Sequence, residues 1–114
     1  MQIKKTSPAD LAIDLLSRSI CSVRVAAVLA DKHGVFGWGW NGVGSDGLGE
    51  HAEAHCLRRS NNKRLAKATM WVAAVRHRTG KPVTAKPCEQ CQKAIRKVGK
   101  VMYRDGDGIW KDLR

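Results

Sequence analysis

EHAEAHCLRRSN (residues 50–61) and CEQCQKAIRKV (residues 88–98) are two segments with the composition of helices. The first follows a glycine-rich stretch, Gly42–Gly49, and the second is ended by Gly99. Between them, ATMWVAAVRH (residues 68–77) predicts a mostly buried strand. A strand joined to the next strand through a helix favours parallel pairing in a central sheet.

The remaining elements extend this sheet. Ser7 and Pro8 have the residue types of a helix N-cap and first helical position, and they predict a helix over residues 8–19. Further strands are predicted at residues 21–31 and 35–41, which form a hairpin, at 100–104, and at 109–113, where the last is antiparallel to its neighbour. We therefore predict one α/β domain over residues 1–114, a three-layer α-β-α fold with a mixed sheet of about five strands and helices on both faces.

Charge and hydropathy narrow the possible classes of protein. The 114 residues include 21 Lys and Arg against 10 Asp and Glu, a formal charge of +11, and the hydrophobic content of 43% is enough for one packed core. Residues 63–114 carry 14 basic and 4 acidic side chains, whereas residues 1–62 carry 7 and 6. No apolar run approaches a membrane span or a signal peptide. We expect a cytoplasmic protein whose basic second half attracts a polyanion.

Two short motifs bring metal-binding side chains to the starts of the two predicted helices. Cys88 and Cys91 are three apart and so project from the same side of a helix. With the His51 imidazole they make a three-ligand zinc site that leaves a fourth position for water, as in catalytic zinc centres. His51 and Glu53 are only two apart, which on a helix would separate them, so we expect the site to lie beyond the end of the helix.

The combined pattern, H-x-E followed by P-C-x-x-C, is the signature of zinc nucleobase deaminases. Over nearly its whole length, the chain resembles the cytidine deaminase-like superfamily. The resemblance implies a zinc-dependent hydrolase that converts cytosine to uracil, with Zn²⁺ held by His51, Cys88 and Cys91. It also implies that Glu53 is not a zinc ligand but the catalytic residue that shuttles protons between water, the ring nitrogen and the departing ammonia.

The same resemblance suggests substrate-binding residues. It implies that Asn41 contacts the sugar, and that the backbone amide of Ala52 and the carbonyl of Lys86 hold the base. Trp38 is one of three aromatic residues, with Phe36 and Trp40, that could supply a stacking face. The Asn41-Gly42 pair is also a favoured turn sequence, which is a purely structural reason for an Asn here.

The sequence leaves the substrate open. The charge favours cytosine in single-stranded DNA or RNA. Free cytidine, deoxycytidine or (d)CMP is the second reading, and adenosine in RNA is a third. A non-catalytic nucleic-acid-binding module with structural zinc is an alternative from another class, and a closed site that adds His55 to the three ligands would fit it. The short C-terminal end resembles cytidine deaminase and certain bacterial toxin deaminases, and a homo-oligomer is expected to cover an exposed sheet face.

Overall fold

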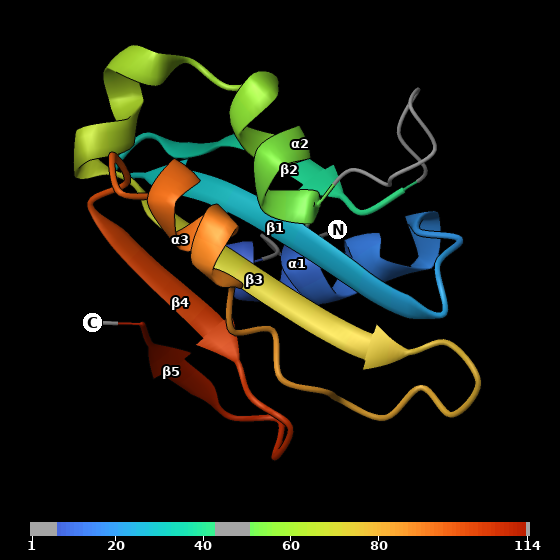
Figure 1. Ribbon diagram of the computed structural model, residues 1–114. Coiled ribbons are helices and arrows are strands. Elements are labelled where there is room, and N and C mark those ends of the chain that lie inside the picture. Colours follow the sequence, from blue (N-terminus) through green and yellow to red (C-terminus); the bar gives the residue numbers. More distant parts are fainter. Residues whose placement is uncertain (1–6, 43–50, 114) are drawn as a thin grey trace, which may run out of the picture.

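A mixed five-stranded sheet with the order β2-β1-β3-β4-β5 forms the middle layer of the molecule (Figure 1). The computed structural model describes residues 7–42 and 51–113. The strands are β1 (Val23–Asp31), β2 (Gly34–Trp40), β3 (Thr69–Arg76), β4 (Lys100–Arg104) and β5 (Trp110–Asp112). The helices are α1 (Pro8–Asp14), α2 (Ala52–Arg58) and α3 (Glu89–Ala94), with 3₁₀ helices η1 (Leu15–Arg18) and η2 (Asn62–Lys67).

Strand pairing follows the connections along the chain. The hairpin partners β1 and β2 are antiparallel, β1 is also antiparallel to β3, and β5 is antiparallel to β4. The parallel pair is β3 and β4, which are joined through α3. This confirms the predicted mixed sheet, including parallel pairing across α3 and an antiparallel last strand.

Helices cover both faces of the sheet. On one face, Leu15 and Leu16 pack against Ala26, Val28 and Ala73 of the two central strands. On the other face, residues of α2, η2 and the α3 region pack against the opposite sides of the same strands; the buried residues that they contribute are Ala52, Cys56, Leu65, Ile95 and Val98. The α/β prediction with three layers is confirmed.

The helices are shorter than the sequence predicts. The predicted helix 8–19 begins as expected, because Ser7 Oγ caps it by accepting a hydrogen bond from the Asp10 amide at 3.1 Å. It is α-helical only to Asp14 and continues as the 3₁₀ helix η1. The segments 50–61 and 88–98 are helical over 52–58 and 89–94, and η2 was not predicted. Most of the predicted glycine-rich loop, residues 43–49, lies outside the described residues. Within those residues, no helix is long and apolar enough to cross a membrane.

Two glycines of β2 let α2 lie directly on the sheet. A Cβ at Gly39 would lie 2.5 Å from the Cys56 amide nitrogen and 3.0 Å from the Ala52 carbonyl oxygen, and a Cβ at Gly37 would collide with the Ser60 hydroxyl. Only glycine therefore permits this approach. The close packing fixes where α2 begins, which is the position of the predicted zinc motif.

Candidate active site

The two predicted motifs meet where α2 and α3 begin. His51 is the N-cap residue of α2 and has extended backbone angles, φ −71° and ψ 146°. Cys88 is the N-cap residue of α3, and Cys91 lies in the first turn of that helix. Two residues that are two apart within a helix point to different sides. His51 precedes the helix, so its side chain can point to the same place as that of Glu53.

His51, Cys88 and Cys91 form a group whose ligand atoms all lie within 4.8 Å of one another. The His51 Nδ1 atom is 3.1 Å from Cys91 Sγ and 3.9 Å from Cys88 Sγ. Tetrahedral zinc with Zn–S and Zn–N bonds of usual length separates such atoms by about 3.5 Å. The donor set and its spacing therefore fit Zn²⁺, and no fourth His, Cys or carboxylate of the described residues joins the group.

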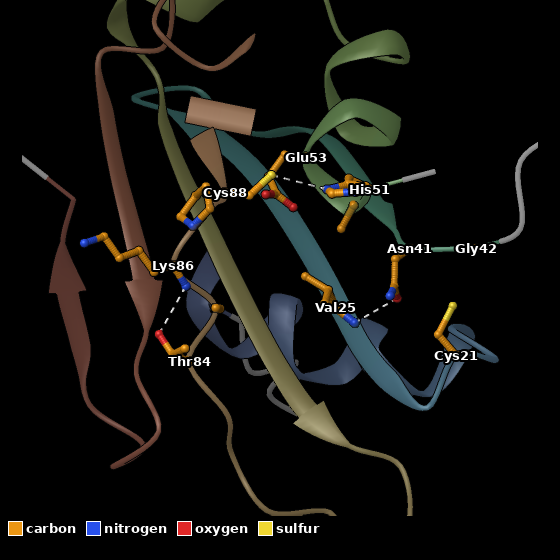
Figure 2. A pocket seen from close by; sticks show the side chains of 12 residues that line it. Cys21, Val25, Asn41, Gly42, His51, Glu53, Thr84, Lys86 and Cys88 are labelled. Carbon is orange, nitrogen blue, oxygen red and sulfur yellow. Dashed lines mark hydrogen bonds between the residues drawn. The ribbon is translucent and has the colours of Figure 1, made fainter. Parts of the chain in front are cut away.

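Glu53 is buried beside these ligands, with 5% of its surface exposed. Figure 2 shows its carboxylate directed toward the same cavity as His51 and Cys88. Burial raises the pKa of the Cys91 thiol, and the Glu53 carboxylate and Cys88 raise it further. A cation among these groups would offset both effects and favour the thiolates.

His55 does not complete a closed zinc site. Its Nδ1 lies 3.2 Å from the backbone nitrogen and 3.0 Å from the backbone oxygen of Trp40, and its ring meets the Trp40 ring edge-on at 5.0 Å. This arrangement holds His55 against the edge strand. The three-ligand arrangement of catalytic zinc centres is the one that the structure presents.

A cavity of about 360 Å³ opens beside the metal-binding group (Figure 2). A volume of this size holds one small molecule or one base with part of its sugar. Its lining combines the end of β2, the start of α2, the first residues of the β1 region and the segment that leads into α3. The lining residues are Cys21, Val25, Asn41, Gly42, His51, Ala52, Glu53, Thr84, Ala85, Lys86, Pro87 and Cys88.

Asn41 lies in the cavity wall and also ties β2 to β1. Its Oδ1 accepts hydrogen bonds from the Val25 amide at 2.9 Å and the Ser19 hydroxyl at 2.5 Å, and its Nδ2 donates to the Val23 carbonyl at 2.8 Å. These contacts use both lone pairs of the oxygen and one of the two amide hydrogens. Among the residues that the structure describes, the second amide hydrogen has no acceptor and is available to a ligand.

Ala52 and Lys86 line the cavity from different segments. Ala52 is the first residue of α2, so its amide is among those without a partner inside the helix. Lys86 is exposed, and its own amide donates to Thr84 Oγ1 at 3.3 Å. The cavity thus brings together Asn41, Ala52 and Lys86, the three positions for which the family resemblance implies polar contacts with the substrate.

Trp38 is not among the residues that line the cavity. Successive side chains of a strand alternate between faces. Gly37 and Gly39 face α2, whereas Trp38 pairs with Val28 on the face that α1 covers. The structure therefore does not bring Trp38 to the base-binding position that the sequence assigned to it.

The family described as the cytidine and deoxycytidylate deaminase zinc-binding region matches residues 4–104, which include all three metal-binding residues and Glu53. The chain belongs to this family. It is a zinc-dependent hydrolytic deaminase of the cytidine deaminase type. No curated protein sequence shows a significant match to the chain.

Solved structures support the fold assignment. The cytidine deaminase from Burkholderia pseudomallei is 18% identical, with a TM-score of 0.68, and the similarity covers 92% of this chain and 87% of that chain. The cytidine deaminase from Mycobacterium leprae is 16% identical, with a TM-score of 0.58, and the similarity covers 92% and 89%. At such low identity, these likenesses show a shared fold.

Some cavity residues were not predicted from the sequence. Cys21, Val25 and Thr84 line the cavity, although none belongs to a motif. Thr84 lies in the extended segment before α3, which is tied to the sheet by the hydrogen bonds from Val83 to Ala74 and from Ala85 to Arg104. The one feature of the sequence that could have indicated Thr84 is its position three residues before Pro87. The segment that leads into a helix with metal ligands must pass close to the site.

Proposed function

We propose that this deaminase acts on cytosine in single-stranded DNA or RNA. The observation that carries the proposal is the excess positive charge of residues 63–114. This half of the chain supplies α3 and the cavity residues 84–88. Three of the four acidic residues after position 62 form ion pairs with lysines of the same half: Asp105 and Asp107 with Lys111, and Asp112 with Lys100. The excess of basic side chains therefore remains for a polyanionic partner.

The size of the cavity is consistent with a single target base that is flipped out of a polynucleotide. About 360 Å³ admits one base with part of its sugar. Deaminases of polynucleotides extrude the target nucleotide in this way or act on a single strand. The exposed Lys86 at the cavity wall would meet a flanking phosphate.

His51, Cys88 and Cys91 would hold Zn²⁺, which when bound is a Lewis acid that lowers the pKa of water to about 7. Glu53 would accept a proton from the attacking water and pass it to the ring nitrogen beside the amino-bearing carbon. It would then accept the second proton of the same oxygen and pass it to the amino group, which leaves as ammonia. The Ala52 amide and the Lys86 carbonyl would orient the base, and the second amide N–H of Asn41 would contact the sugar. Only 5% of the surface of Glu53 is exposed, which limits the contact of this carboxylate with bulk water.

The proposal is tested by one incubation of zinc-loaded protein with a mixed-sequence single-stranded oligonucleotide, cytidine, deoxycytidine and dCMP. Mass spectrometry then reports which species exchange an amino group for oxygen. Conversion of cytosine in the oligonucleotide supports the proposal. Conversion of the free species alone contradicts it and leaves the family assignment intact.

A second candidate substrate is free cytidine, deoxycytidine or (d)CMP. The observation in its favour is that two solved structures similar to this chain are named cytidine deaminases. An uncharged nucleoside gains nothing from the basic surface, so its conversion should be insensitive to salt, whereas reaction on a polynucleotide should weaken as salt rises.

Two further expectations accompany the proposed function. The protein is expected in the cytoplasm, whose reducing conditions keep Cys88 and Cys91 available as thiolates. A homo-oligomer is also expected, and exposed Ile20 and Ile109, with 81% and 59% of their surfaces accessible, are the apolar side chains that a second copy would cover. Sedimentation at micromolar concentration tests this, and a monomeric mass would refute it.

A further inference from the structure

The aromatic residues of β2 carry arginines over their rings. Phe36, Trp38 and Trp40 alternate with glycines along this strand, which forms one edge of the sheet. Arg64 lies 4.1 Å from the Phe36 ring centroid, Arg59 lies 5.5 Å from that of Trp38, and Trp40 has Arg59 at 5.9 Å and Arg18 at 5.5 Å. We call these six residues the β2 track.

The outer part of the track is open to solvent. Trp38 is 39% exposed, and Arg18 and Arg59 are exposed. In the part of the chain that the structure describes, neither arginine is in an ion pair. Exposed aromatic rings beside uncompensated guanidinium groups are the combination by which proteins bind single strands: bases stack on the rings, and phosphates neutralise the charge.

One end of the track reaches the active-site cavity. Asn41 directly follows Trp40 and lines that cavity. At about 3.3 Å per residue, Trp38 lies roughly 10 Å along the strand from Asn41. When the target base of a polynucleotide occupies the cavity, the neighbouring nucleotides are therefore within reach of Trp40 and Trp38.

The other end reaches a second, basic hollow of about 670 Å³ at the turn between β1 and β2. Lys32, Lys63 and Lys67 line this hollow. Its single acidic residue, Asp31, is held by Arg64 in two hydrogen bonds of 2.7 and 2.8 Å. The lysines therefore keep their charge uncompensated there, which suits a phosphate.

We propose that a single-stranded polynucleotide binds along the β2 track, with a base stacked on the exposed Trp38 ring and a backbone phosphate in the basic hollow. This inference rests on the proposed function, because it supplies the path by which a strand reaches the cavity. The partner is a single-stranded polynucleotide rather than another protein, because basic side chains dominate the track and the hollow and Asp31 is paired with Arg64. The Trp38 ring is also open to solvent.

Binding of a fluorescent oligothymidylate, measured by anisotropy at low salt, tests this inference without catalysis, because the probe contains no cytosine. Trp38→Ala should weaken binding by at least about fivefold, and Trp38→Phe, which keeps a stacking ring, should restore most of the affinity. Arg59→Ala should weaken binding more than Arg78→Ala, which removes an equal charge from an exposed position outside the track. Zinc content and thermal unfolding show whether each variant is folded.

The inference is overturned if Trp38→Ala binds the probe as tightly as the wild-type protein, or if Arg59→Ala loses no more affinity than Arg78→Ala. It is also overturned if Trp38→Ala changes only the sedimentation of the protein, which would assign the track to contact between copies. Deamination of oligonucleotides is scored separately. If Trp38→Ala loses probe binding, the β2 track is supported even when no oligonucleotide is deaminated. If oligonucleotides are deaminated and Trp38→Ala binds the probe normally, the proposed function is supported and the β2 track is rejected.

Discussion

His51 Nδ1 lies 3.1 Å from Cys91 Sγ, although the two residues are 40 positions apart in the chain. This proximity depends on two helices that begin at the same point above the sheet, α2 after the β1–β2 hairpin and α3 after β3. Neither helix carries a complete site. The packing of both onto one face of the sheet assembles it.

Removal of this imidazole should empty the metal site. His51→Ala leaves two thiol ligands, so we expect purified protein to lose its stoichiometric zinc, measured by atomic emission. Cys56→Ala is the matched control, because Cys56 lies outside the ligand group and burial raises its pKa to about 12, which keeps it a neutral thiol. Full zinc occupancy in His51→Ala would contradict the assignment.

Replacement of the buried carboxylate should separate zinc binding from turnover. Glu53→Gln keeps the size of the side chain but cannot carry a proton between water and base. We expect zinc content to be preserved while the deamination rate falls by at least about a hundredfold. A variant that retains more than a tenth of the wild-type rate would show that another group moves the proton.

The contact between β2 and α2 should be sensitive to a single methyl group. In Gly39→Ala the new Cβ would lie 2.5 Å from the Cys56 amide, so α2 must shift and displace His51 and Glu53. We expect a loss of about 1–3 kcal/mol in the free energy of unfolding, together with weaker zinc binding. Gly106→Ala, where the nearest atom is 3.9 Å away, should leave both unchanged.

The ion pair at the β1–β2 turn should make stability depend on pH in the acid range. The hydrogen bonds from Arg64 lower the pKa of Asp31 from 3.8 to about 2. Because this pKa is lower in the folded chain, the pair stabilises the fold above about pH 4, and the contribution is lost as the pH falls toward 2. Asp31→Asn should flatten the acid dependence in urea unfolding, whereas exposed Asp14→Asn should not.

The metal-binding residues could be predicted from the sequence because their chemistry is tied to local spacing. Two cysteines three apart lie on one side of a helix wherever that helix sits, and a His and a Glu at a helix start can reach the same point. The order of helices and strands further predicted parallel pairing across α3, and the structure has it.

The positions of Trp38 and His55 could not be predicted in this way. Both depend on tertiary packing: the glycines of β2 admit α2 so closely that His55 reaches the Trp40 backbone, and the alternation of the strand then turns Trp38 away from the cavity. The predicted helices were also too long. Residue composition does not show where a helix ends or where its last turn becomes 3₁₀.

The most direct test of the account compares one reaction on two substrates over a series of salt concentrations. The rate of cytosine deamination is measured for a single-stranded oligonucleotide and for free deoxycytidine, with wild-type protein. We predict that the rate per enzyme at low substrate falls steeply with salt for the oligonucleotide, with a log–log slope of about −0.7 for each phosphate contacted, and stays nearly constant for the nucleoside. Equal salt dependence of the two rates, or turnover of deoxycytidine alone, would contradict the account.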